Sequence, residues 1–330
     1  MMQRVGMAIG AGLAAALLFA VLAKGTLLAM ALAYLAPLPI VIATLGWGLD
    51  MGALAAAIAS VGAAIVVDPL SGGLFAVSIG LPAWLLSFLG LLRRDRLHPF
   101  YPFASAKTDD KTWFPIGGVV AAAALIGAIV GAGALASLVL VYGGYRKGVD
   151  ALAAELVPDL KDALDGVMAL PGGVSVEEFA SLIVRLSPAV LAGTTCLMLC
   201  ANLYAGARAV QLSQRLTRPW ANLPEALVLP PLLGIALIAC VGLTFALPGS
   251  ASHAAWIGVG SLGCAYVMQG LAVAHCLSRG LPARTPMLIA LYVVCVVVVR
   301  WSLPALALVG LVESLLSLRA RRAAAAKIKS

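Results

Sequence analysis

A few polar side chains interrupt the apolar segments of this sequence, and their types could carry chemistry. Glu313 is the one acid well inside such a segment, and Arg319 follows it by about one and a half helical turns. Asn202 and Gln269 place amide groups within two other segments. Because burying polar groups in hydrocarbon is costly, such residues usually face a cavity or a partner. Glu313 is therefore either half of an ion pair or a group that binds a ligand or proton, and Gln269 either packs through hydrogen bonds or contacts a ligand.

The sequence Ala36-Pro37-Leu38-Pro39-Ile40 interrupts another apolar segment near its centre. Each proline removes a backbone donor and clashes with the preceding turn, so a helix must kink or break here. Broken helices at the membrane midplane often build transporter binding sites, and a kink packed among neighbours is the alternative. Tyr34 is the polar group nearest the break. The ligand-binding candidates are therefore Tyr34, Pro37, Pro39, Asn202, Gln269 and Glu313.

The constellations that most enzymes use are missing from the sequence. The three histidines, His98, His253 and His275, include no pair with the i, i+4 spacing of a helical zinc site, and there is no Walker A phosphate loop. All six cysteines fall inside apolar segments, where we interpret them as small packing residues rather than disulfide partners. We therefore expect no catalytic site, no metal and no cofactor.

Glycine pairs recur in the apolar segments. The run Gly258-Val-Gly260-Ser-Leu-Gly263 matches a dinucleotide-binding pattern, but no strand precedes it, and close packing of helices is the better interpretation. The pairs Gly6–Gly10 and Gly127–Gly131 have the GxxxG spacing and the same interpretation.

The overall composition defines the elements that must position these residues. Of 330 residues, 62% are apolar and 11% charged, and the mean hydropathy is +1.05. A soluble domain is nearer half apolar and a quarter charged, so this class of protein is excluded. Ten continuous apolar segments approach the length of about 20 residues that a membrane-spanning helix needs. They are residues 5–23, 26–46, 52–67, 73–92, 115–141, 181–204, 228–247, 255–277, 286–300 and 303–318. The predicted fold is an all-α polytopic transmembrane helix bundle of about ten spans.

The basic residues predict the orientation of these spans. With a cytoplasmic N-terminus and one crossing per span, 16 of the 22 basic residues fall on the cytoplasmic side, as the positive-inside rule requires. These are Arg4, Arg93, Arg94, Arg96, Lys107, Lys111, Arg208, Arg215, Arg218, Arg279, Arg284, Arg319, Arg321, Arg322, Lys327 and Lys329. Both termini are therefore predicted to be cytoplasmic, and the net charge of +8 requires no nucleic-acid partner. Trp47, Trp113 and Trp220 fall at predicted inner ends, as interfacial anchors do.

The first segment has two interpretations. Arg4, the apolar stretch and Val21–Leu22–Ala23 resemble a secretory signal peptide with its cleavage site. A second long apolar run begins almost at once, which favours an uncleaved span in a tight helical hairpin.

The non-membrane parts divide the chain into three predicted regions. Residues 1–142 hold five spans and a basic, irregular inner loop at 93–113, and residues 181–330 hold five more spans and a basic tail. The outer segment 143–180 has apolar residues at three- and four-residue spacing from Val149 onward, which predicts an amphipathic helix. We expect Pro171-Gly172-Gly173 to end it and a capping box of Ser175 and Glu178 to start the next span. This helix either covers the bundle at the outer interface or forms a lid over a cavity.

Three stretches together resemble a known family. They are Leu35–Ile40, the passage from Asn202 through Tyr204, Arg208 and Arg218-Pro-Trp220 to Pro230, and the last helix with Glu313 and Arg319. They are similar to the YybS-like bacterial polytopic membrane proteins, a domain of unknown function that is distantly similar to the substrate-binding S components of energy-coupling-factor transporters.

The resemblance implies a multi-pass protein of the bacterial cytoplasmic (inner) membrane. It would bind or transport a small molecule, with energy supplied by a separate coupling subunit and ATPases, and the lipid bilayer would be its other partner. The alternative from the residues is a non-transporting envelope scaffold or assembly protein.

Overall fold

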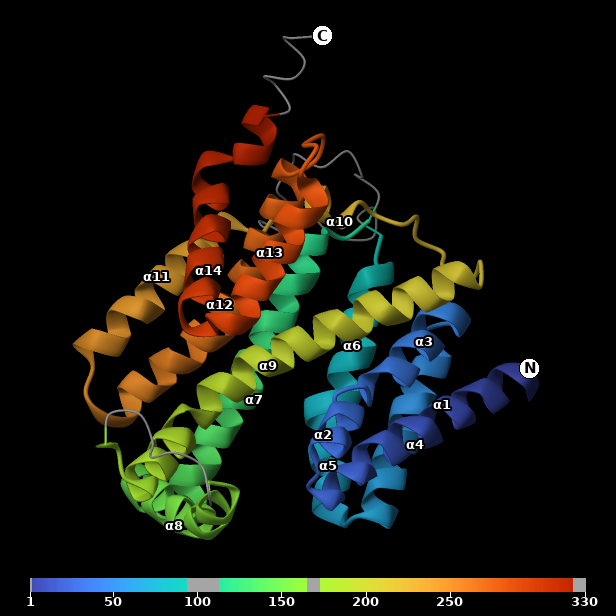
Figure 1. Ribbon diagram of the computed structural model, residues 1–330. Coiled ribbons are helices and arrows are strands. Elements are labelled where there is room, and N and C mark those ends of the chain that lie inside the picture. Colours follow the sequence, from blue (N-terminus) through green and yellow to red (C-terminus); the bar gives the residue numbers. More distant parts are fainter. Residues whose placement is uncertain (1, 94–112, 165–172, 323–330) are drawn as a thin grey trace. The chain divides into compact units, whose positions relative to one another are not determined.

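The computed structural model describes residues 2–93, 113–164 and 173–322, and within them the chain is helical with no strand (Figure 1). Among these described residues, eight helical segments are long and apolar enough to cross a membrane: Met2–Lys24, Leu27–Trp47, Leu49–Val66, Pro69–Leu91, Ile116–Val141, Val176–Leu212, Gly249–Leu277 and Val299–Leu316. Two shorter apolar helices, Pro231–Ala246 and Arg284–Val297, occupy the remaining predicted segments. The predicted all-α polytopic bundle is confirmed, and the protein is a multi-pass integral membrane protein.

Some spans consist of more than one helical element. The elements in chain order are α1 (Met2–Ala20), η1 (Val21–Lys24), α2 (Leu27–Ala33), α3 (Pro37–Trp47), α4 (Leu49–Val66), α5 (Pro69–Phe75), η2 (Ala76–Gly80), α6 (Leu81–Leu91), α7 (Ile116–Val141), α8 (Tyr145–Leu164), α9 (Val176–Leu212), α10 (Leu223–Ala226), α11 (Pro231–Ala246), α12 (Gly249–Leu277), α13 (Arg284–Val297) and α14 (Val299–Leu316). The turn η2 is π-helical and ends two residues before Pro82, whose missing N–H cannot continue the α-helical ladder.

The helices group into two compact units. Unit 1 comprises residues 1–123, 196–231 and 265–330, and unit 2 comprises residues 124–195 and 232–264. The chain passes from one unit to the other within α7, α9 and α12 and at the start of α11.

Small residues bring α1 and α4 of unit 1 close together. A Cβ atom on Gly12 would lie 2.7 Å from the Ala55 carbonyl oxygen, and one on Gly62 would lie 2.8 Å from the Ala16 methyl. Lipid tails are as apolar as side chains, so helices in a membrane associate through such close backbone packing. Ile40 of α3, Phe75 of α5 and other buried residues extend this contact into a core cluster of unit 1.

The helices α12 and α14 of unit 1 meet through a second pair of glycines. A Cβ on Gly270 would collide with the Leu306 carbonyl, and a Cβ on Gly310 would collide with the Tyr266 carbonyl. The two backbones therefore touch at this crossing.

Unit 2 is also packed through glycines. Gly193 of α9 faces the Gly260 carbonyl of α12, and Gly258 faces the Cys240 side chain of α11. Helix packing is thus confirmed for Gly258 and Gly260. The same interpretation is wrong for Gly6 and Gly10, because both lie exposed on α1 and a Cβ on either would meet nothing within 4 Å.

The predicted amphipathic helix of the outer segment is α8 in unit 2, with Pro158 inside it. Val149 and Ala153 pack against Ala180 and Val184 of α9, so its apolar face covers the first turns of that helix. The capping box is confirmed: the Glu178 N–H donates to Ser175 Oγ and the Ser175 N–H donates to Glu178 Oε2, each at 3.1 Å. The predicted end at Pro171 and Gly172, most of the inner loop 93–113 and the end of the basic tail lie outside the described residues.

Candidate functional site

The predicted helix break lies between α2 and α3. The N–H groups of Leu35, Ala36 and Leu38 each donate three residues back, to Leu32, Ala33 and Leu35, which tightens the backbone into a turn. Pro37 is the first residue of α3, where its missing N–H costs nothing. Because the Leu38 N–H bonds to the Leu35 carbonyl, the carbonyl of Tyr34 loses its usual helical partner.

Asn202 of α9 supplies the missing partner. Its Nδ2 donates to the Tyr34 carbonyl and to the Met198 carbonyl of its own helix, each at 2.8 Å. The side chain is 3% exposed, and its Oδ1 is buried with no hydrogen-bond partner among the described residues. Asn202, Tyr34 and the Pro37 break, which the sequence singled out separately, therefore lie together in unit 1. The Tyr34 side chain itself is exposed, and Pro39 is half-buried.

Gln269 of α12 satisfies another irregular stretch of backbone. Its Oε1 accepts the Leu229 N–H at 2.6 Å, just before the two prolines that lead into α11. Its Nε2 donates to the Gly310 carbonyl at 2.6 Å and to Ser314 Oγ at 2.8 Å, both on α14. This fully buried amide thus joins α12 and α14 to the segment that precedes α11.

Glu313 forms a buried ion pair, which is one of the two roles that the sequence predicts for it. Arg319 Nε donates to Glu313 Oε1 at 2.9 Å, and the two side chains are 8% and 6% exposed. Ser317 adopts the left-handed conformation at the end of α14 (φ 50°), and the chain turns so that the Arg319 backbone N–H also donates to Glu313 Oε2, at 3.3 Å. The ion pair closes this turn.

The guanidinium of Arg319 also holds the short helix α10. Its Nη1 donates to the Pro224 carbonyl at 2.5 Å and its Nη2 to the Leu227 carbonyl at 2.9 Å. Arg279, at the end of α12, binds Asn222 Oδ1 at 2.6 Å and pairs with Glu225. The segment around α10 is therefore clamped from two sides.

Next to this clamped segment, unit 1 contains an apolar cavity of about 350 Å³. Its walls come from α3, α6, α7, α9, α10, α12 and the irregular stretch between α9 and α10, and they are formed by Leu45, Gly90, Leu91, Ile116, Val119, Val120, Leu197, Cys200, Ala201, Leu203, Tyr204, Ala207, Leu216, Arg218, Pro219, Trp220, Ala221, Leu223, Leu227, Met268 and Leu271. None of the six candidate residues lines it. Gln269 and Glu313 affect the cavity indirectly. Gln269 binds the backbone just after Leu227, and Glu313 pairs with Arg319, which binds the backbone beside Leu223 and at Leu227.

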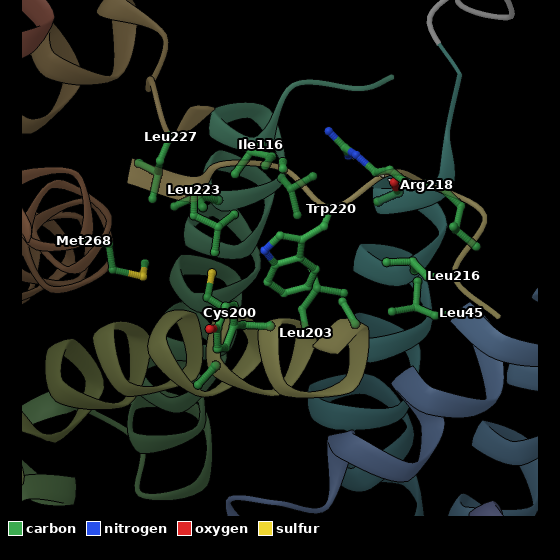
Figure 2. Close-up of a pocket in the computed structure, with 18 of the residues that line it drawn as sticks. Leu45, Ile116, Cys200, Leu203, Leu216, Arg218, Trp220, Leu223, Leu227 and Met268 are labelled. Carbon is green, nitrogen blue, oxygen red and sulfur yellow. Dashed lines mark hydrogen bonds between the residues drawn. The ribbon is translucent and has the colours of Figure 1, made fainter. Parts of the chain in front are cut away.

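One face of α9 forms the floor of the cavity. Leu197, Cys200 and Tyr204 recur at three- and four-residue spacing, which places them on one stripe of the helix. Figure 2 shows the Trp220 indole reaching from the irregular stretch toward Cys200 and Leu203 of this helix. The Trp220 ring lies 5.6 Å from the Tyr204 ring, centroid to centroid.

Three arginines adjoin the cavity. Arg218 lines it and donates from Nη1 to the Gly90 carbonyl at 3.1 Å. The Arg208 guanidinium lies 5.4 Å from the centre of the Trp220 ring, and that of Arg215 lies 4.8 Å from the centre of the Trp47 ring. Both contacts have the geometry of cation–π interactions.

Sequence reasoning did not identify this cavity. It assigned Trp220 to interfacial anchoring and the three arginines to the positive-inside pattern. The sequence feature that could have indicated the cavity is the spacing of Leu197, Cys200, Tyr204 and Arg208, which places all four on one stripe of α9.

In the described part of the chain, no group of three or more His, Cys, Asp and Glu side chains could hold a metal ion. Comparison with protein families, with curated proteins and with solved structures finds no match to this chain.

Proposed function

We propose that this multi-pass membrane protein binds a membrane amphiphile and holds its hydrocarbon chain in the cavity of unit 1. The cavity itself is the main support for this proposal, because its walls are almost entirely apolar and aromatic. Its volume of about 350 Å³ falls within the usual range of small-molecule sites, about 300–1,000 Å³.

The chemistry of the walls favours a chain over a polar metabolite. A polar molecule in this cavity would lose its hydrogen bonds to water and find few partners on Leu197, Leu203 or Met268. A hydrocarbon chain loses no hydrogen bonds when it leaves the bilayer for such walls, and it packs closely against their side chains.

The clamped segment around α10 also favours a binding function. Arg319, Arg279 and Gln269 fix the backbone on both sides of Leu223 and Leu227. A wall held in this way is preorganised, so little ordering entropy is lost when a ligand binds. Binding is also the first step of the S-component-like transport that the sequence resemblance implies, in which a coupling subunit and ATPases of the bacterial inner membrane would act later.

A space-filling substitution tests the proposal. Ala201 lines the cavity, whereas Ala205, one turn further along α9, is exposed and does not line it. We expect protein purified in mild detergent to retain an amphiphile that mass spectrometry detects, Ala201→Phe to lose it, and Ala205→Phe to keep it, with melting temperatures checked for all three. Equal retention in both variants, or none in the unsubstituted protein, would contradict binding in this cavity and favour the predicted scaffold function.

A further inference from the structure

We propose that the amphiphile carries a phosphate head group, which the guanidinium groups of Arg208 and Arg215 bind at the edge of the cavity. This inference rests on the proposed function, because it assigns the head group of the molecule whose chain occupies the cavity.

The α9 stripe leads from the apolar floor to the first of these charges. Arg208 follows Tyr204 by four residues, so its side chain emerges on the same face one turn beyond the floor. Its guanidinium stacks on Trp220, whose indole is part of the cavity wall. A chain lying along Leu197, Cys200 and Tyr204 would therefore end near Arg208.

The second arginine stands beside residues of the wall. Leu216 lines the cavity directly after Arg215, whose guanidinium stacks on Trp47, two residues beyond the lining residue Leu45.

Carboxylates neutralise three other arginines of unit 1, but the structure pairs no carboxylate of the described residues with Arg208 or Arg215. Arg4, Arg279 and Arg319 each pair with an acid, namely Asp50, Glu225 and Glu313. Within residues 2–93, 113–164 and 173–322, neither Arg208 nor Arg215 forms an ion pair. Arg208 binds only the neutral amide of Gln211, at 2.5 Å, beside its ring contact. Among the lining residues there is no acid at all.

These charges match a phosphate ester better than a neutral or carboxylate head group. A guanidinium presents a planar fork of donors that binds phosphate oxygens in pairs, and stacking on an indole orients the fork while leaving its edge available. Two such groups provide more positive charge and more donors than a single carboxylate uses. The bilayer is the source of the ligand, because free inorganic phosphate would leave the apolar cavity empty.

Cys200 provides a native reporter for the test, since it lines the cavity. In a variant that keeps Cys200 and replaces the other five cysteines by alanine, we would measure the rate of alkylation by N-ethylmaleimide. The probes are dodecyl phosphate, dodecanol and inorganic phosphate. Dodecyl phosphate should halve the rate at a concentration about tenfold or more below that of dodecanol, because hydrogen bonds to charged groups are stronger than neutral ones. Inorganic phosphate should neither protect Cys200 nor displace dodecyl phosphate.

Variants that lack an arginine charge then show which residues cause the preference for dodecyl phosphate over dodecanol. Arg208→Gln combined with Arg215→Gln should abolish the preference for dodecyl phosphate while protection by dodecanol stays unchanged. Arg321→Gln, at an exposed arginine distant in sequence from the lining residues, should preserve the preference. The variants are compared only where their melting temperatures match.

The outcomes separate the two proposals. Equal protection by dodecanol and dodecyl phosphate, or a preference that survives the double substitution, overturns the phosphate site and leaves chain binding intact. Displacement of dodecyl phosphate by inorganic phosphate alone overturns the bilayer source. Protection by neither amphiphile overturns both proposals.

Discussion

The Asn202 side chain donates to the Tyr34 carbonyl at 2.8 Å, although 168 residues separate the two in sequence. This bond pairs a carbonyl that the Pro37 break has deprived of its helical partner. In a membrane such a carbonyl has no water to bind, so irregular backbone must find a partner within the protein.

Removal of this bond should destabilise the protein without unfolding it. We expect Asn202→Leu to lower the free energy of unfolding by about 1 kcal/mol, since hydrogen bonds between membrane helices contribute roughly 0.6 kcal/mol on average and a buried carbonyl is left unpaired. Thr194→Val is the control, because the Thr194 hydroxyl bonds only within α9, to the Val190 and Leu191 carbonyls. Thermal unfolding in detergent measures both, and equal stability of the two variants would argue against the role of Asn202 at the break.

The buried pair of Glu313 and Arg319 should be far more sensitive than the exposed pair of Glu225 and Arg279. Glu313→Gln leaves the Arg319 charge buried without its counter-ion, and we expect a loss of about 3 kcal/mol. Glu225→Gln removes an exposed pair and should cost less than about 1 kcal/mol. If Glu313→Gln keeps full stability and loses only ligand, Glu313 is a ligand-binding group, as the alternative interpretation of the sequence holds.

The crossing of α12 and α14 can be tested with two glycines of one helix. Gly270→Ala should destabilise the protein, because the new methyl group meets the Leu306 carbonyl. Gly263→Ala adds a methyl group where nothing lies within 4 Å, and it should be neutral or stabilising by up to about 1 kcal/mol through helix propensity. Melting temperatures measure the difference, and a Gly270→Ala variant as stable as Gly263→Ala would show that the two helices do not touch there.

Asp68 should make a pH-dependent contribution at the start of α5, between two spans. The Ser71 hydroxyl donates to its carboxylate at 2.5 Å and the Ser71 N–H at 3.0 Å, and these bonds lower the pKa of Asp68 below its ordinary value of 3.8. Because the folded-state pKa is the lower one, the stabilisation is present above about pH 4 and disappears as the pH falls through the folded-state pKa. Unfolding followed between pH 7 and pH 3 should show Asp68→Asn less stable than the unsubstituted protein at neutral pH, with the difference narrowing as the pH falls below about 4. A constant difference across this range would contradict the assignment.

Much of the fold could be predicted because membrane spans follow from local composition. Each of the ten predicted segments is helical, and the break at Pro37 follows from the missing proline donor. The ends were less accurate. The apolar segment predicted for the sixth span was 181–204, whereas α9 runs from Val176 to Leu212. Its start follows the predicted Ser175 cap, but its end was missed because polar residues after Tyr204 continue the helix.

The cavity could not be predicted in the same way. Its walls combine residues as distant in sequence as Leu45 and Leu271, and periodicity within one helix does not indicate which faces converge. The polar residues were identified correctly as unusual, but sequence alone could not reveal that Gln269 and Arg319 bind irregular backbone. Their partners, Leu229 and Pro224, belong to a segment with no strong pattern of its own.

Photo-crosslinking would show directly whether an amphiphile binds in the cavity. A dodecyl phosphate analogue with a diazirine at the end of its chain would be irradiated with the protein and the labelled residues mapped by peptide mass spectrometry. We predict labelling of the α9 floor around Leu197 and Cys200 and of Trp220, and its loss with excess dodecyl phosphate. The reference is the exposed face of α13, where Val296 and Val297 are 80% and 74% exposed. Labelling of the α9 floor no stronger than that of α13, or undiminished by competitor, would contradict the account.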